Sequence, residues 1–201
     1  MSSIKIGHLL RSSTTGFVVG CSVAQFQNPV FGALVKAPLE ARYQIYGLIY
    51  DIHIDDDGLV RQLVTVGNVD NDVMRDNRER RIVPVEMSVL TLGYQENGQI
   101  KHLLPPRPPL SLDEIVYCGE DELRQLTSTG RFGYFRHILR AKDAPIGELL
   151  AAHLEQAKVA HESAGDSNWV NAAAQELIIL LRDDYPRLMS LLGALGDAVQ
   201  G

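Results

Sequence analysis

Four arginines within seven residues are the side chains whose type and spacing most directly suggest a binding function. The four are Arg75, Arg78, Arg80 and Arg81. Arginine forms paired hydrogen bonds with phosphate and carboxylate groups, so the segment is a candidate contact for a phosphorylated ligand or an acidic protein surface. The alternative is an exposed loop whose charge is neutralised by its acidic neighbours, which are Asp72, Asp76 and Glu79.

A further candidate contact is Arg107, which lies within the proline run Pro105–Pro109. Four of the nine prolines of the chain fall in these five residues. The segment must therefore be extended, and its prolines cannot donate hydrogen bonds to a sheet. Such a run can be a ligand for a groove that recognises polyproline. The sequence favours the other interpretation, a rigid strap that crosses one end of a barrel.

The motifs of the common enzyme classes are missing from this sequence. It contains no Gly-x-x-x-x-Gly-Lys phosphate loop, no Gly-x-Gly-x-x-Gly, no His-Glu-x-x-His and no Gly-x-Ser-x-Gly. We therefore expect a protein that is not an enzyme, with no catalytic residues and no cofactor. We also expect that it neither binds nor hydrolyses ATP.

The sequence also shows no pattern of metal ligands. Its six histidines never fall at ligand spacing with a cysteine or a carboxylate. His153, on the apolar side of a predicted helix, is interpreted as a core histidine. Two acidic clusters, Asp55–Asp57 and the pair Asp70 and Asp72, lack the spacing of a calcium loop and are interpreted as solvated turns. We therefore predict no metal site.

The composition predicts a cytoplasmic protein with a substantial core, because 45% of the residues are hydrophobic. Cys21 and Cys118 lie far apart in apolar runs and are expected to be reduced. No segment has the length of a signal peptide or of a membrane span. A formal net charge of −6 and an aromatic fraction of 6% give no strong case for direct binding to nucleic acid.

The N-terminal part of the sequence has the patterns of β-strands. Alternating apolar residues predict strands over Gly16–Gly20, Phe31–Lys36, Ile45–Ile54, Leu59–Val66, Arg81–Leu92 and Leu110–Cys118. The strand Ile45–Ile54 is apolar on both faces, which is typical of a strand covered on both sides. Gly47 within it indicates a bend or a close approach of another backbone. Asn97 and Gly98 predict a type I′ hairpin turn. These features favour a small, closed or nearly closed β-barrel over residues 1–118.

From Gly119 onward the apolar residues recur with a helical period. Helices are predicted over Glu120–Leu126 and Arg131–Ala141, and a longer one begins at Pro145. A second long helix has Val170, Ala173, Leu177, Ile178 and Leu181 on one face. Pro186 either kinks that helix or opens a third, whose apolar stripe is Leu188, Leu191, Leu192, Leu195 and Val199. The predicted fold class is α+β: a barrel over residues 1–118 and an all-helical region over residues 119–201.

Three stretches of the barrel region carry a resemblance to a known family. They are Gly16–Gly20, Phe31–Lys36 with Phe26 before it, and Ile45–Ile52. Together they resemble the HAS barrel, the small N-terminal β-barrel of HerA-type DNA-translocating ATPases and of rotary ATP synthases. In that family the barrel precedes the motor domain and helps to build the ring. The resemblance implies an assembly role for residues 1–118. It carries over no catalytic residue, because no phosphate loop follows.

The function expected from the sequence is that of a non-enzymatic interaction or assembly module. Its partner would be another protein, such as a HerA-like ATPase ring, or a second copy of the chain. The competing hypothesis is a small-molecule-binding or enzymatic barrel whose site is assembled from scattered residues. The predicted partner contacts are Arg75, Arg78, Arg80, Arg81 and Arg107.

Overall fold

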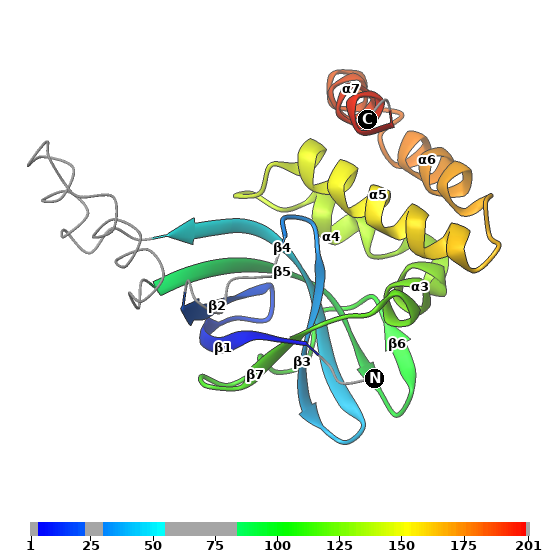
Figure 1. Ribbon diagram of the computed structural model, residues 1–201. Helices are drawn as coiled ribbons and strands as arrows, with labels where there is room; N and C mark the ends of the chain where they lie inside the picture. Colours follow the sequence, from blue (N-terminus) through cyan, green and yellow to red (C-terminus); the bar gives the residue numbers. More distant parts are fainter. Residues whose placement is uncertain (1–3, 23–29, 55–83, 200–201) are drawn as a thin grey trace, which may run out of the picture.

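The computed structural model describes residues 4–22, 30–54 and 84–199, and within them the chain has an N-terminal β-barrel followed by helices (Figure 1). The strands are β1 (Lys5–Ser12), β2 (Gly16–Ser22), β3 (Leu34–Glu40), β4 (Tyr43–Ile54), β5 (Pro84–Glu96), β6 (Gln99–Lys101) and β7 (Glu114–Tyr117). The helical elements are α3 (Glu120–Ser128), η2 (Thr129–Phe132), α4 (Phe135–Leu139), α5 (Ile146–Ser163), α6 (Trp169–Leu180) and α7 (Tyr185–Val199). The predicted α+β class is confirmed. The arginine segment 75–81, the acidic clusters and the predicted strand Leu59–Val66 lie outside the described residues.

Six antiparallel strands close the barrel in the order β2, β1, β7, β3, β4 and β5. The ring is completed where β2 pairs with β5, from Gly16 opposite Leu90 to Ser22 opposite Pro84. β6 then extends the sheet as the hairpin partner of β5. Because each strand of the ring has a neighbour on both sides, closure satisfies backbone groups that an open edge would leave unpaired.

β4 is covered on both sides over Ile45–Ile49, as its sequence predicts, whereas Asp51, His53 and Ile54 at its end are exposed. Ile45 and Ile49 pack in the barrel interior, whereas Tyr46 and Leu48 belong to a second core shared with the helices. The interior is filled by Ile6, Leu9, Phe17, Val19, Ala33, Val35, Ala37, Ile45, Ile49, Met87, Val89, Tyr94 and Ile115. The barrel therefore has a packed centre of its own, and its outer face over β3, β4 and β5 supports the helices.

Gly47 lies at a point of close approach between β4 and β5, which confirms the prediction. The pairing between these strands shifts register between Tyr46 and Gly47. A Cβ at Gly47 would lie 2.5 Å from Val89 Cγ1 and 2.7 Å from the Leu90 carbonyl oxygen. No side chain fits there, so the bulge requires glycine.

Several predicted strand limits are wrong by a few residues. β3 continues past Lys36 to Glu40 and includes Pro38, which was expected in the connection. A proline is tolerated there because β7 pairs with β3 only at Val35 and Lys36, and so Pro38 interrupts no ladder on that side. β5 continues past Leu92 to Glu96, where the predicted turn is confirmed: Asn97 and Gly98 both have positive φ, 51° and 83°. β7 is shorter than predicted and begins at Glu114.

The helical region follows its apolar periodicity with two exceptions. The predicted helix Arg131–Ala141 is helical as α4 only from Phe135, because Gly130, Arg131 and Phe132 all have positive φ. Pro145 precedes α5, and Pro186 lies in the first turn of α7, so it opens a third helix instead of kinking the second. Ile178 and Leu192 were expected on buried stripes, but they are 45% and 39% exposed. In the described residues no helix is long and apolar enough to cross a membrane.

Candidate interaction surface

The helices α6 and α7 present a group of exposed apolar side chains, here called the α6–α7 face. Figure 1 shows both helices on the outer side of α5, away from the barrel. The α6–α7 face consists of Ile178, Ile179, Leu180, Tyr185, Met189 and Leu192. Each of these side chains is at least 39% exposed, and Tyr185 reaches 67%. Apolar residues concentrated on one pair of helices are typical of a contact surface.

The sequence of each helix explains why this face is left uncovered. On α6 the positions Trp169, Ala173 and Leu177 repeat every four residues and are buried. The last turn then adds three further apolar residues, Ile178 to Leu180, which the narrow contact with the core cannot cover. On α7, Leu191 is buried, while Tyr185, Met189 and Leu192 recur at spacings of four and three on an exposed side.

Charges of both signs border the α6–α7 face in the turn between the helices. Arg182 and Asp183 are highly exposed, with side chains 74% and 91% accessible, and they form an ion pair of 3.3 Å. Asp184 follows, and its carboxylate accepts a hydrogen bond from the Arg187 amide at 3.2 Å. The turn therefore offers both a cation and an anion beside the apolar side chains.

Arg107 is the one predicted contact residue that the described part of the chain contains. Its guanidinium group forms a 2.5 Å ion pair with Glu40 and lies 6.0 Å from the ring centre of Tyr43. Pro109 accepts a hydrogen bond from the Ser12 hydroxyl at 2.6 Å. The proline run thus contacts the ends of β1 and β3, as expected of a strap that crosses the barrel end. Arg107 remains exposed, and its role as a partner contact stays a prediction.

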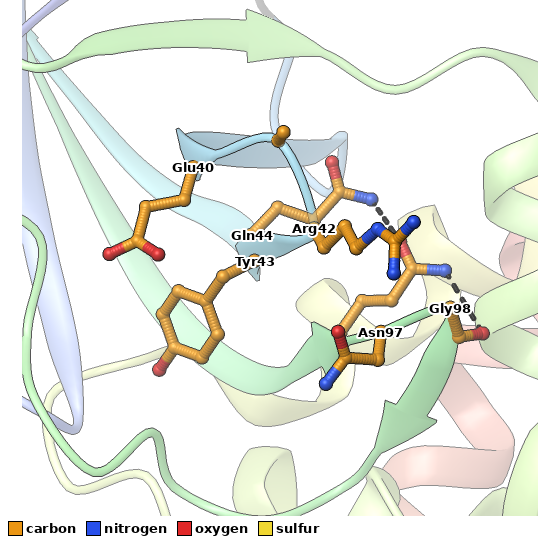
Figure 2. Close-up of a pocket in the computed structure, with 8 residues that line it drawn as sticks. Glu40, Arg42, Tyr43, Gln44, Asn97 and Gly98 are labelled. Atoms are coloured by element: carbon orange, nitrogen blue, oxygen red, sulfur yellow. Dashed lines mark hydrogen bonds between the residues drawn. The ribbon is translucent and has the colours of Figure 1, made fainter.

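A hollow of about 400 Å³ lies beside the strap, between the β3–β4 and β5–β6 turns. Figure 2 shows Glu40 and Tyr43 on one side of it and Arg42, Asn97 and Gly98 on the other. Gln95 accepts a hydrogen bond from Gln44 and donates one to the Gly98 carbonyl oxygen at 3.3 Å. The Asn97 amide also donates a hydrogen bond to the Arg42 carbonyl oxygen at 2.9 Å, which holds the two turns together, whereas the Tyr43 hydroxyl has no hydrogen-bond partner among the described residues.

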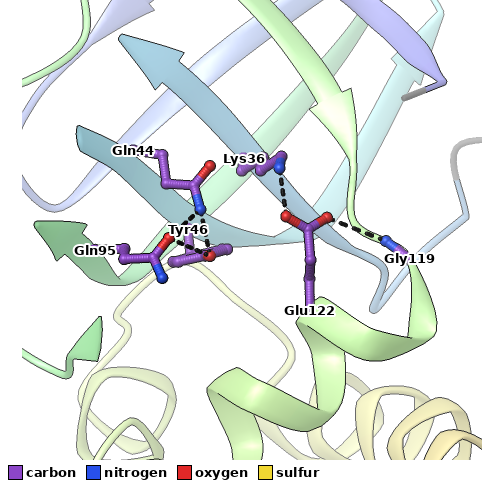
Figure 3. Close-up of polar contacts among 6 residues, drawn as sticks. All are labelled: Lys36, Gln44, Tyr46, Gln95, Gly119 and Glu122. Atoms are coloured by element: carbon purple, nitrogen blue, oxygen red, sulfur yellow. Dashed lines mark hydrogen bonds and ion pairs between the residues drawn. The ribbon is translucent and has the colours of Figure 1, made fainter. Parts of the chain in front are cut away.

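The barrel is fixed to the helices by a polar link, which Figure 3 shows. Lys36 on β3 forms an ion pair with Glu122 in the first turn of α3. The second carboxylate oxygen of Glu122 accepts a hydrogen bond from the Gly119 amide at 3.4 Å. An acidic side chain in the first turn also suits the positive end of the helix dipole. The link therefore sets the direction in which α3 leaves β7.

The structure brings together a Thr–His–Asp series that the sequence does not indicate. The Thr127 hydroxyl lies 2.8 Å from His161 Nε2, and His161 Nδ1 lies 3.3 Å from Asp166. This order resembles a nucleophile with its base, but Thr127 is 1% exposed and its hydroxyl also contacts the Leu123 carbonyl oxygen at 2.8 Å. A nucleophile must be reachable by its substrate. We therefore interpret the series as a brace between α3 and the end of α5.

His153 is a core histidine, as the sequence predicts. It is fully buried, and its Nε2 lies 3.2 Å from the Tyr134 hydroxyl oxygen. Burial lowers the pKa of His153 to about 4, although the nearby backbone of Gly32 opposes the shift. The side chain is therefore neutral at pH 7 and acts as a hydrogen-bonding member of the core.

The two cysteines and the possible metal ligands can be judged within the described part of the chain. Cys21 and Cys118 are both free thiols, as predicted. Burial raises the pKa of Cys118 well above its ordinary value, so the thiol is protonated at neutral pH. Within residues 4–22, 30–54 and 84–199, no three histidine, cysteine or acidic residues group in a way that could hold a metal ion.

Comparison of the sequence with models of known protein families and with curated proteins gives no significant match.

Proposed function

We propose that this protein is a non-enzymatic assembly module that associates with a second copy of itself through the α6–α7 face. The observation that carries the proposal is the exposure of six large apolar side chains on two adjacent helices. Removing such residues from water is the main driving force of association. The barrel, with its separate packed interior, would be the rigid support on which the helices are presented.

The charged residues beside the α6–α7 face favour a second copy of the chain as its binding partner. The α6–α7 face is itself apolar, so its partner must present a comparable apolar surface. In a two-fold contact the same patch serves both partners, and a residue on one copy meets a different residue on the other. Arg182 of one copy can then approach Asp183 or Asp184 of the other, because both signs border the face. The surface is thus complementary to itself.

The resemblance to the HAS barrel also supports an assembly role, but only through the general architecture of the barrel. The barrel is closed and antiparallel, and such an architecture is compatible with a small barrel of that kind. The finer assignment to the HAS family remains part of the proposal, together with a cytoplasmic location. A HerA-like ATPase ring is the other partner that the resemblance implies, and it would be examined next if the test below shows no self-association.

The non-enzymatic part of the proposal is supported by how the buried polar groups are used. His153 and Tyr134 are hydrogen-bonded to each other in the core, and the Thr127–His161 pair is closed to solvent. The barrel interior is filled by apolar side chains, which disfavours a ligand inside it. The competing hypothesis of a small-molecule site therefore has to place that site outside the barrel.

The test is sedimentation of the full chain over a concentration series. Wild-type protein is expected to be a dimer, and Ile179→Glu combined with Met189→Glu is expected to be a monomer. The control is Leu110→Glu combined with Leu112→Glu, which makes the same charge change at residues that follow the proline run and are 72% and 76% exposed. The control should remain a dimer. A monomeric wild type would overturn self-association, and the ATPase ring would become the partner to examine.

A further inference from the structure

A cleft of about 740 Å³ lies outside the barrel, where the β1–β2 turn approaches the connection between α4 and α5. One side is the turn from Ser12 to Thr15, and the other is the connection from Arg140 to Ala144. Its floor includes Leu90 and Thr91 of β5. The size is in the range of small-molecule sites in proteins.

The charged side chains that line this cleft are mostly cationic, although the whole chain is acidic. Arg11, Arg140 and Lys142 line it, with Asp143 as the one carboxylate among its lining residues. Arg11 is partly neutralised by Glu86, at 3.4 Å. Arg140 and Lys142 form no ion pair with any residue in the described ranges. These two charges are therefore available to an anion.

A serine hydroxyl fixes the shape of the turn on one side of the cleft. The Ser13 hydroxyl oxygen accepts hydrogen bonds from the amides of Thr15 and Gly16 at 3.3 and 3.2 Å, which holds the turn in one shape. Thr91 is 1% exposed, and its hydroxyl has no hydrogen-bond partner among the described residues. The hydroxyl oxygen is itself shielded from solvent, so Thr91 borders the cleft without presenting this group to its opening.

Most of the remaining lining residues are apolar; Phe17 and Val89 among them are buried, and His137 adds an imidazole. Leu104 is 43% exposed, and Leu90 and Tyr50 are half-buried beside it. Ala144 adds a small apolar side chain in the connection before α5. A ligand that satisfied the cations alone would leave these side chains in contact with water. The cleft thus combines an apolar wall with a cationic rim.

We propose that this cleft binds a small amphipathic organic anion. Its phosphate or carboxylate group lies between Arg140 and Lys142, and its apolar body lies against Leu90 and Leu104. Charge-assisted hydrogen bonds from the two cations provide selectivity for the anion. This site does not depend on the α6–α7 face, which lies on other helices.

The test is a titration of the full chain with small probes, followed by amide chemical shifts in NMR spectra. The probes are phenyl phosphate, phenylacetate, uncharged benzyl alcohol and inorganic phosphate. At least one aromatic anion is expected to shift the amides of Ser13, Thr15 and residues 140–144. Which of the two aromatic anions binds more tightly assigns the site to a phosphate or to a carboxylate. Benzyl alcohol and inorganic phosphate should each bind at least about tenfold more weakly, since each lacks one half of the interaction.

Substitutions then test whether Arg140 and Lys142 bind the anionic group. Arg140→Gln with Lys142→Gln should weaken binding of the aromatic anion by about tenfold or more. The matched control is Lys158→Gln with Arg131→Gln, which removes the same charge away from the cleft and should bind as wild type does. The proposal is overturned if no aromatic anion binds, if benzyl alcohol or inorganic phosphate binds equally well, or if both double variants lose affinity to the same extent.

Discussion

The ammonium group of Lys36 on β3 is paired with the carboxylate of Glu122 on α3, and both side chains are largely shielded from water, at 16% and 28% exposure. The pair joins two elements that lie 86 residues apart in the sequence. It is placed where the outer face of the barrel meets the first helix (Figure 3). Removing one partner of such a shielded pair is costly, because the charge that remains is poorly hydrated.

Replacing Lys36 should therefore destabilise the fold. For Lys36→Met we expect a loss of about 1–3 kcal/mol in the free energy of unfolding, measured by urea denaturation. The control is Lys5→Met, which breaks the more exposed 3.6 Å pair with Glu114 and should cost less than about 1 kcal/mol. Equal losses in the two variants would show that the Lys36 pair is no stronger than an ordinary surface pair.

The bulge at Gly47 should not tolerate a side chain. For Gly47→Ala we expect destabilisation by about 1–3 kcal/mol, since the added methyl group would clash with Val89 and with the Leu90 backbone. Gly119→Ala is the control, because nothing lies within 4 Å of its Cβ position and its φ is −75°. Thermal unfolding of both variants measures the difference. A Gly47→Ala protein as stable as wild type would mean that the strands can separate at this point without cost.

Stability should decrease as the pH falls from about 6.5 to about 4, because His153 has a lowered pKa in the folded state. In this window the unfolded chain binds a proton at His153 and the folded chain does not, so acid favours unfolding. The contribution is about 3 kcal/mol over the whole window, from a shift of about 2.5 pKa units.

His153→Gln should flatten this pH dependence, since glutamine does not titrate. The flattening is partial, because burial also lowers the pKa of three other histidines, His102, His137 and His161. Urea denaturation of both proteins at pH 7 and pH 5 provides the comparison. An unchanged difference between the two pH values would show that His153 is not the group responsible.

The two regions should behave differently when they are separated. A fragment of residues 1–118 is expected to unfold cooperatively with a β-type circular dichroism spectrum, because its barrel is closed. It would expose Tyr46, Leu48 and Leu92, which the helices normally cover, so we also expect light scattering to show self-association. A fragment of residues 119–201 should be partly helical or associated. A monomeric and stably helical 119–201 would identify an independent second domain.

The arginine segment gives a prediction that concerns a partner. Changing Arg78, Arg80 and Arg81 to glutamate should abolish capture of the partner without lowering the melting temperature, if the segment is a contact site. The measurement is affinity purification with wild-type and variant protein side by side. Capture that is equal for both would return the segment to the interpretation as a charge-balanced loop.

Features that depend on near neighbours in the chain could be predicted from the amino-acid sequence. An apolar run on both faces identified β4, and Asn97 with Gly98 identified the hairpin turn, because alternation and turn geometry are set within a few residues. The change from a period of two to a helical period located the start of the helices. The same local information identified His153 as a core residue, since its helical spacing places it among apolar side chains.

The contacts between segments that are distant in the sequence became known only from the three-dimensional structure. An apolar stripe in a helix sequence does not show how much of the stripe other elements bury. Ile178 and Leu192 were therefore assigned to the core, although they are exposed. The pairing of β2 with β5 closes the barrel between segments that no local pattern connects. Arg11 and Arg140 line one cleft although 129 positions separate them. Such contacts depend on the packing of the whole chain, because the free energy of burial is gained only when distant segments come together.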